Sequence, residues 1–142
     1  MARTRILLAD DHEEMRDFVT KLLEREYEIV EAVGDGRTFL EAASRLNPDL
    51  CLLDISMPIM DGIQAAAQLK ASGSTAKVIM LTICEGEDFV REAFKNGASG
   101  YVIKRRIARD LALAVTEVLA GRTFISSPST LDIEKSRPRR KR

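Results

Sequence analysis

Five short strand-like runs, each followed by a segment of helical periodicity, constrain the fold of this chain more than any other feature. The run Leu50–Leu53 has four consecutive apolar residues. Such a run is typical of a central strand that is covered on both faces. The strand-like runs are 6–9, 27–33, 50–53, 78–81 and 100–103, and the helical segments are 13–24, the stretch between Gly36 and Asn47, 61–71, 87–96 and 107–120.

This alternation predicts an α/β fold with a doubly wound parallel sheet. Each crossover between parallel strands must be right-handed, so the intervening helices pack on both faces of the sheet. The functional crevice of such a sheet lies beyond the carboxyl ends of the strands. The polar residues at these ends are Asp10 and Asp11 after the first run, Asp54 after the third, Thr82 after the fourth and Lys104 after the fifth.

The residue types at this edge of the sheet suit the binding of a phosphoryl group. Three carboxylates in one crevice repel each other unless a cation lies among them. Mg²⁺ fits this role, because it prefers oxygen ligands and leaves coordination positions for water and phosphate. The ammonium group of Lys104 suits a phosphoryl oxygen, and Thr82 offers a hydroxyl donor.

Simpler roles also exist for several polar residues. Asp10, Asp35 and Asp61 could each cap a helix. His12 follows the acid pair and could suggest a metal ligand, but we favour a surface position at the start of the first helix. Met57 and the nearby Met60 suit loop anchors that pack on the core.

Length and composition predict one globular domain in the cytoplasm. The chain has 142 residues, of which 45% are hydrophobic and 31% charged. No apolar stretch approaches the roughly 18 residues of a membrane span, and we see no signal-peptide region, so we expect no membrane contact. The two cysteines, Cys51 and Cys84, lack metal-ligand spacing and are predicted to be free thiols.

The basic residues concentrate at the C-terminal end. Residues 137–142 hold five of the 22 basic residues, which leaves 17 basic against 22 acidic residues elsewhere, a net charge of −5. We assign residues 1–127 to the domain and residues 128–142 to a basic linker or disordered tail. The tail could contact nucleic acid or an acidic surface, but a solvated end is the favoured interpretation.

Over residues 4–127 the chain resembles the receiver domain of two-component response regulators, the CheY-like family. The resemblance rests on Asp10-Asp11, on Asp54 within Leu-Leu-Asp-Ile-Ser-Met-Pro-Ile-Met-Asp-Gly, on Thr82 and on Gly97-Ala-Ser-Gly-Tyr-Val-Ile-Lys104. It implies a flavodoxin-like (βα)5 fold with a five-stranded parallel sheet of order 2-1-3-4-5. The stretches 9–12, 97–101 and 119–122 are similar to the NarL/FixJ branch.

The resemblance implies that Asp54 takes a phosphoryl group from the phosphohistidine of a sensor histidine kinase. Mg²⁺ would be held by Asp10, Asp11, Asp54 and the backbone carbonyl of Ser56. Such a protein is a phospho-accepting switch that catalyses only its own phosphorylation and dephosphorylation, not a metabolic enzyme.

The family also implies roles around the acceptor. Thr82 and Tyr101 would form the switch, in which Tyr101 rotates inward after phosphorylation. Ser56 and Cys84 would set the lifetime of the phosphorylated form. Arg105 follows Lys104 where many receivers have proline, so the usual cis-proline geometry of this loop cannot be assumed.

Two other functional classes fit less well. A phosphatase of the haloacid dehalogenase type usually has a second acid two residues after the nucleophile, where this chain has Ser56. A flavodoxin-like electron carrier needs a phosphate loop after the first strand, where residues 10–14 are Asp-Asp-His-Glu-Glu. A receiver that serves only as an interaction module is a third possibility.

The output of the chain stays open between two alternatives. It could be the N-terminal part of a NarL/FixJ-type DNA-binding transcription regulator, or a stand-alone receiver that signals by protein–protein interaction. We expect possible homodimerisation on phosphorylation and no binding of nucleic acid by residues 1–127.

Overall fold

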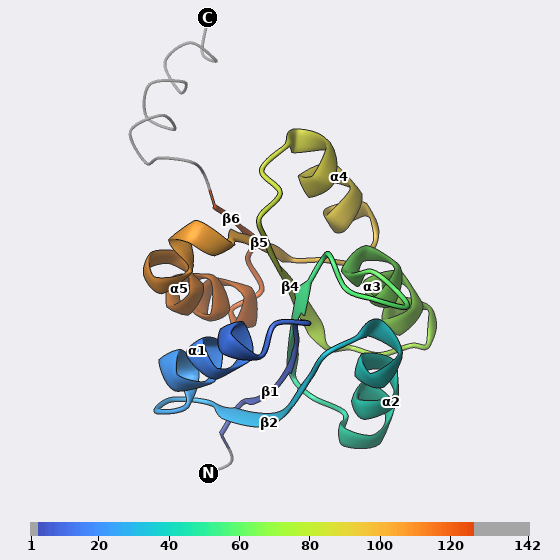
Figure 1. The fold of residues 1–142 in the computed structure, drawn as a ribbon, viewed down its shortest axis with the longest axis horizontal. Helices are drawn as coiled ribbons and strands as arrows, with labels where there is room; N and C mark the ends of the chain where they lie inside the picture. The colour runs from blue at the N-terminus through green and yellow to red at the C-terminus, as the bar shows by residue number, and fades with distance from the viewer. Residues whose placement is uncertain (1–2, 127–142) are drawn as a thin grey trace, which may run out of the picture.

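A parallel sheet of six strands forms the centre of the molecule in the computed structural model, which describes residues 3–126 (Figure 1). The strand order is β2-β1-β3-β4-β5-β6. The predicted order of the first five strands is therefore confirmed, and a sixth strand adds to the edge beyond β5. The strands are β1 (Arg5–Ala9), β2 (Glu28–Val33), β3 (Leu50–Asp54), β4 (Lys77–Thr82), β5 (Gly100–Ile103) and β6 (Phe124–Ile125).

Helices cover both faces of the sheet, as the alternation predicts. In Figure 1, α1 and α5 lie on one side, and α2, α3 and α4 lie on the other. The helices are α1 (Glu13–Leu23), α2 (Gly36–Leu46), α3 (Gly62–Ala71), α4 (Glu87–Lys95) and α5 (Ile107–Leu119), and a short 3₁₀ turn, η1 (Lys104–Arg106), links β5 to α5.

Successive residues of the central strands point into two separate cores. Leu52 packs with α1 and α5 residues such as Val115, whereas its neighbour Leu53 packs with Phe39 on the other side of the sheet. All five residues of β3 are buried. Burial of each large apolar side chain contributes about 1.5–3 kcal/mol, so β3 holds its terminal carboxylate on a firmly anchored strand.

Two of the three candidate capping residues are helix caps. The Asp35 carboxylate accepts a hydrogen bond from Thr38 N at 2.8 Å at the start of α2. Asp61 accepts from Gln64 N at 2.8 Å, and the Gln64 side chain accepts from Asp61 N, which completes a capping box at α3. Asp10 instead accepts from His12 N at 2.9 Å and faces the site described below.

The sixth strand was not predicted, because its two residues are too few to show a periodic pattern. Phe124–Ile125 pairs with Gly100 and Tyr101 of β5. Ser126 N continues this pairing by donating to the Tyr101 carbonyl at 2.8 Å. The predicted tail, residues 128–142, lies outside the described residues.

Both cysteines are free thiols, as predicted, with Cys51 buried and Cys84 partly exposed. Burial raises the pKa of the Cys51 thiol to about 12.

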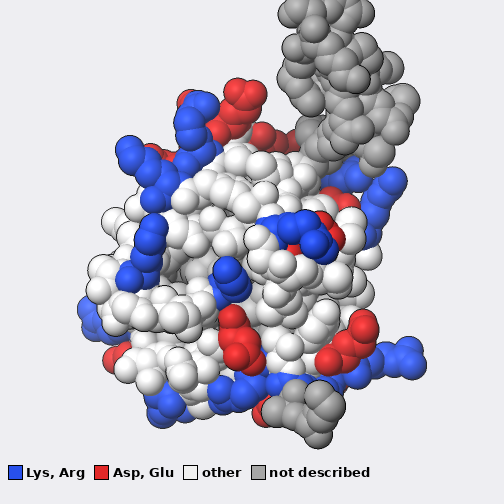
Figure 2. All heavy atoms as spheres, turned by 180° about the vertical axis from the view of Figure 1, so that it is seen from behind, with Lys and Arg blue, Asp and Glu red and all other residues white. Residues whose placement is uncertain are grey.

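Figure 2 shows that basic and acidic side chains are interspersed on the face behind that of Figure 1. Within residues 3–126, no helix combines the length and the hydropathy that a membrane span requires.

Candidate functional site

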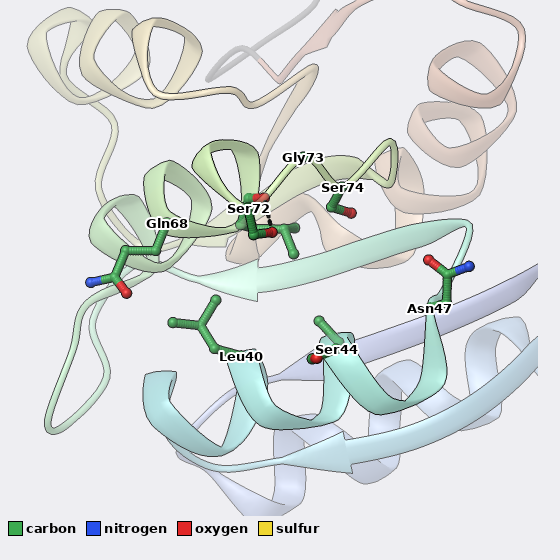
Figure 3. Close-up of a pocket in the computed structure, with 9 residues that line it drawn as sticks. Leu40, Ser44, Asn47, Gln68, Ser72, Gly73 and Ser74 are labelled. Carbon is green, nitrogen blue, oxygen red and sulfur yellow. Dashed lines mark hydrogen bonds between the residues drawn. The ribbon is translucent and has the colours of Figure 1, made fainter.

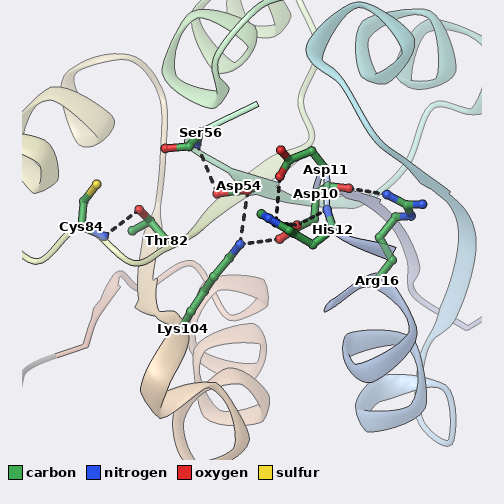
Figure 4. Close-up of polar contacts among 9 residues, drawn as sticks. All are labelled: Asp10, Asp11, His12, Arg16, Asp54, Ser56, Thr82, Cys84 and Lys104. Carbon is green, nitrogen blue, oxygen red and sulfur yellow. Dashed lines mark hydrogen bonds and ion pairs between the residues drawn. The ribbon is translucent and has the colours of Figure 1, made fainter. Parts of the chain in front are cut away.

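Three charged side chains from three strand ends meet at one edge of the sheet. The ammonium nitrogen of Lys104 lies 2.7 Å from Asp10 Oδ2 and 3.2 Å from Asp54 Oδ2 (Figure 4). The side chains of Asp10 and Asp54 are 0% and 5% exposed. The structure therefore brings together the strand-end residues that the sequence analysis singled out, in a pocket largely removed from solvent.

The loop after β3 fits tightly around the Asp54 carboxylate. Ser56 N donates to Asp54 Oδ1 at 3.2 Å, and Gly62 N donates to the Ile55 carbonyl at 2.7 Å. A Cβ atom at Gly62 would lie 2.2 Å from the Asp54 carbonyl oxygen. Only glycine fits this approach, so Gly62 positions the loop that carries Ser56.

Asp11 and His12 close the opposite side of the cluster. His12 Nδ1 lies 2.9 Å from Asp11 Oδ1 and 3.4 Å from Asp10 Oδ1. One ligand atom each from Asp10, Asp11, His12 and Asp54 lies within 4.8 Å of the others. This arrangement is a candidate cation site, and three of its members are the predicted carboxylates.

The charges in the pocket shift the proton affinity of its members. Burial, reinforced by the negative charge of Asp10, raises the pKa of Asp54 to about 6, although Lys104 opposes this shift. Burial alone would lower the pKa of Lys104, but its hydrogen bond to Asp10 and the charges of both carboxylates hold that pKa above its usual value. Lys104 therefore stays an ammonium group, and one cation among the carboxylates leaves the ionised Asp54 incompletely compensated.

Thr82 ends β4, and Tyr101 of the neighbouring strand β5 contacts the loop that follows Thr82. Thr82 is buried, and its hydroxyl oxygen accepts from Cys84 N at 3.0 Å. Tyr101 is fully buried, and its hydroxyl donates to the Cys84 carbonyl at 2.7 Å. Burial and the nearby Cys84 raise the pKa of Tyr101 to about 12. The ring thus already lies inward in this structure, so the predicted rotation is not needed to reach that position.

Two polar contacts near the site were missed by sequence reasoning. Arg105 makes two hydrogen bonds to the Glu85 carboxylate, at 2.8 and 2.9 Å, and so links the β5–α5 and β4–α4 connections. No peptide bond within the described residues is cis. Asp110 is buried on α5 and accepts from Ser126 at 2.6 Å. Its position beside Leu111 on the core-facing side of the helix was the signal that could have revealed it.

A separate hollow lies between α2 and α3, away from the carboxylates (Figure 3). Its volume is about 490 Å³. None of its lining residues is ionisable, so this hollow offers no group for phosphoryl chemistry. The lining residues are Leu40, Ala43, Ser44, Asn47, Gln68, Leu69, Ser72, Gly73 and Ser74.

Comparison with known proteins places this geometry in a family. The family described as the response regulator receiver domain matches residues 6–116, which is most of the chain. The chain belongs to the response regulator receiver family. The match spans β1 through most of α5, and so includes every strand end that contributes to the pocket.

Two curated relatives resemble this receiver along most of its length. It is 35% identical to the transcriptional regulatory protein DegU of Brevibacillus brevis over 135 residues, 94% of this chain and 57% of DegU. It is 36% identical to the chemotaxis protein CheY of Halobacterium salinarum over 116 residues, 82% of this chain and 97% of CheY. The receiver thus spans little more than half of the DegU-type relative and nearly all of the CheY-type one.

The fold of this receiver matches solved structures of the same family. A two-component response regulator of the LuxR family from Aurantimonas sp. SI85-9A1 superposes with a TM-score of 0.84 at 30% identity, covering 99% of each chain. Further structural neighbours include a receiver domain of a NarL protein. The predicted likeness to the NarL-type branch is therefore confirmed.

Proposed function

We propose that this receiver accepts a phosphoryl group on Asp54 from the phosphohistidine of a sensor histidine kinase. The observation that carries the proposal is the position of Lys104, whose ammonium group contacts Asp54 and Asp10 together at 3.2 and 2.7 Å. Asp54 ends a strand whose five residues are all buried, so its carboxylate is held in place while the ammonium group faces it.

The transfer is an exchange of one bond to phosphorus for another. A carboxylate oxygen of Asp54 forms the new O–P bond, while the N–P bond of the donor phosphohistidine breaks and the imidazole nitrogen keeps the electron pair and takes up a proton. The transition state spreads negative charge over the phosphoryl oxygens, and catalysis is mainly positioning and charge stabilisation. Lys104 supplies a fixed positive charge for one of these oxygens, and the Thr82 hydroxyl can donate to another.

The donor set also fits Mg²⁺. Asp10 and Asp54 are buried and share the single ammonium group described above, and Asp11 adds a third carboxylate. We propose Asp10, Asp11, Asp54 and the backbone carbonyl of Ser56 as the groups that hold the ion. Bound Mg²⁺ would neutralise charge on the carboxylates and the phosphoryl group.

Phosphorylation would then change the surface around β4 and β5. A phosphoryl oxygen on Asp54 would accept a hydrogen bond from the Thr82 hydroxyl. A shift of Thr82 toward it would displace the hydroxyl oxygen, which accepts from Cys84 N. The loop that carries Cys84 also holds the Tyr101 hydroxyl, so movement of this loop would reach β5. We propose Thr82 and Tyr101 as the switch. We propose Ser56, which contacts Asp54, and Cys84, which contacts Thr82, as residues that set the lifetime of the phosphorylated state.

Partners and output are proposals that rest on relatives. The 35% sequence identity to DegU, a transcriptional regulatory protein, supports a role as the receiver part of a DNA-binding regulator. Homodimerisation on phosphorylation belongs to this proposal. Likeness to a chemotaxis CheY supports the alternative of a stand-alone receiver. We also propose that the protein is cytoplasmic and that it catalyses only its own phosphorylation and dephosphorylation.

Incubation with acetyl phosphate and Mg²⁺, followed by intact-mass spectrometry, tests the acceptor role. We expect one added phosphoryl group on the wild type and none on Asp54→Asn, which preserves the side-chain shape. Omission of Mg²⁺ should reduce labelling of the wild type. Equal labelling of Asp54→Asn and wild type would remove Asp54 from the proposed role.

A further inference from the structure

The imidazole of His12 lies against the carboxylate cluster, although its side chain is largely exposed. His12 is the residue before α1, and its side chain makes no capping hydrogen bond there. Its backbone N–H is instead held by Asp10 Oδ1 at 2.9 Å. This contact turns the ring toward the carboxylates, with Nδ1 at 2.9 Å from Asp11 Oδ1 (Figure 4).

Lys104 and His12 approach Asp10 through different oxygens. The ammonium group of Lys104 contacts Asp10 Oδ2, whereas His12 Nδ1 faces Asp10 Oδ1 at 3.4 Å. Lys104 also uses Oδ2 of Asp54. A cation can therefore lie on the His12 side of the cluster without displacing the ammonium group that the proposed phosphoryl transfer requires.

The ligand atoms are almost close enough to bind one ion. One oxygen or nitrogen each from Asp10, Asp11, His12 and Asp54 lies within 4.8 Å of the others. Around an ion with bonds of about 2.1 Å, two ligand atoms on opposite sides are about 4.2 Å apart. A closure of well under 1 Å satisfies this limit. The His12 side chain is 71% exposed, so it is free to make this movement.

Imidazole nitrogen distinguishes between divalent ions in a way that carboxylate oxygen does not. Mg²⁺ binds almost wholly through oxygen and gains little from a nitrogen ligand. Imidazole suits first-row transition ions, whose affinity for nitrogen-containing sites rises from Mn²⁺ to Co²⁺ and beyond. A mixed site of three carboxylates and one imidazole therefore favours the transition ion.

We infer that His12 is a nitrogen ligand of the receiver's cation site, and that this site binds Mn²⁺ and Co²⁺ more tightly than Mg²⁺ because of it. The inference rests on the proposed function only for the location of the site. It makes His12 a residue that determines which ion accompanies phosphorylation.

Titration calorimetry at pH 7.5 with MgCl₂, MnCl₂ and CoCl₂ tests the ion preference. We expect the wild type to bind Mn²⁺ and Co²⁺ at least tenfold more tightly than Mg²⁺. His12→Ala should lose about tenfold in affinity for Mn²⁺ and Co²⁺, the loss typical of a removed contact at a metal site, while its affinity for Mg²⁺ stays within twofold. Glu13→Gln, which changes a neighbouring acid at the start of α1, is the control and should keep the ion preference of the wild type.

Electron spin echo spectroscopy of the Mn²⁺-loaded protein tests coordination directly. We expect a ¹⁴N coupling from the imidazole in the wild type and in Glu13→Gln, and its loss in His12→Ala. A wild-type spectrum without nitrogen coupling, or an equal loss of Mg²⁺ and Mn²⁺ affinity in His12→Ala, would overturn the inference. Both of these results leave Asp54 phosphorylation intact, whereas an absence of any divalent-ion binding would count against the proposed metal site as well.

Discussion

The hydroxyl of Tyr101 donates a 2.7 Å hydrogen bond to the backbone carbonyl of Cys84. This contact ties β5 to the loop that follows β4, two residues beyond Thr82. The Tyr101 ring is fully buried, and its hydrogen bond to the loop is partly buried. The loop next to the proposed acceptor therefore depends on a side chain from the neighbouring strand.

Tyr101→Phe should loosen this loop with little change elsewhere. The substitution leaves the Cys84 carbonyl without its partner, which costs about 1 kcal/mol of unfolding free energy. Hydrogen exchange measured by mass spectrometry should show faster exchange in residues 83–86. Tyr27→Phe, on the opposite edge of the sheet, serves as the control. Unchanged exchange in residues 83–86 would show that Tyr101 does not hold the loop.

Asp54→Asn should stabilise the protein at neutral pH in the presence of EDTA. The folded state raises the pKa of Asp54 to about 6 through burial and repulsion by Asp10. Its charge therefore opposes folding above that pH, and the cost disappears as the pH falls toward 3.8, the ordinary pKa of an aspartate side chain. After allowance for solvent screening, we expect a gain of about 1–2 kcal/mol at pH 7.5, which shrinks steadily between pH 6.5 and pH 4.5.

Urea unfolding across this pH range provides the measurement. Asp88→Asn, whose side chain is 95% exposed, should show no comparable trend. A variant Asp54→Asn that is no more stable than wild type at pH 7.5 would contradict the view that the Asp54 charge is incompletely compensated.

Ser126→Ala should weaken the attachment of β6. The Ser126 hydroxyl donates to Asp110 Oδ2 at 2.6 Å in a buried position, and Arg106 contacts the same oxygen at 3.2 Å. Removal of the hydroxyl leaves Asp110 with fewer partners, which costs about 1–2 kcal/mol. Urea unfolding should detect this loss. Thr123→Ala, at a nearby exposed position, should stay within about 0.5 kcal/mol of wild type, and equal effects of the two variants would rule out a role for the Asp110 contact.

Gly62→Ala should disturb the loop that carries Ser56. The new Cβ atom would lie 2.2 Å from the Asp54 carbonyl oxygen, so the loop or strand must shift. We expect a loss of about 3 kcal/mol and slower phosphorylation by acetyl phosphate. Gly86→Ala is the matched control, because the nearest atom to its Cβ, Phe89 Cδ2, is 3.7 Å away. Thermal unfolding that shows both variants to be equally stable would contradict the close approach at Gly62.

Sequence patterns located the strand-end residues well, because one topological rule places them. Parallel strands end at the same edge of the sheet, so Asp10, Asp54 and Lys104 had to converge once the alternation was recognised. The same reasoning could not show how side chains turn at that edge. His12 is a surface residue at the start of α1, as predicted, but its approach to Asp11 depends on the backbone turn held by Asp10.

Contacts between distant segments were beyond the reach of local patterns. β6 has only two residues, and its place is set by pairing with β5 and by the contact between Ser126 and Asp110. The ion pair between Arg105 and Glu85 likewise joins two loops that are far apart in the sequence. Each of these features requires knowledge of which elements are neighbours in space.

Borohydride reduction of the phosphorylated protein, followed by peptide mass mapping, tests the central claim most directly. Reduction converts an aspartyl phosphate to homoserine and so marks the residue that carried the phosphoryl group. After incubation with acetyl phosphate and Mg²⁺, we expect homoserine at position 54 and at no other acidic position. Homoserine at position 10 or 11, or a phosphorylated protein with unmodified Asp54, would contradict the assignment of Asp54 as the acceptor.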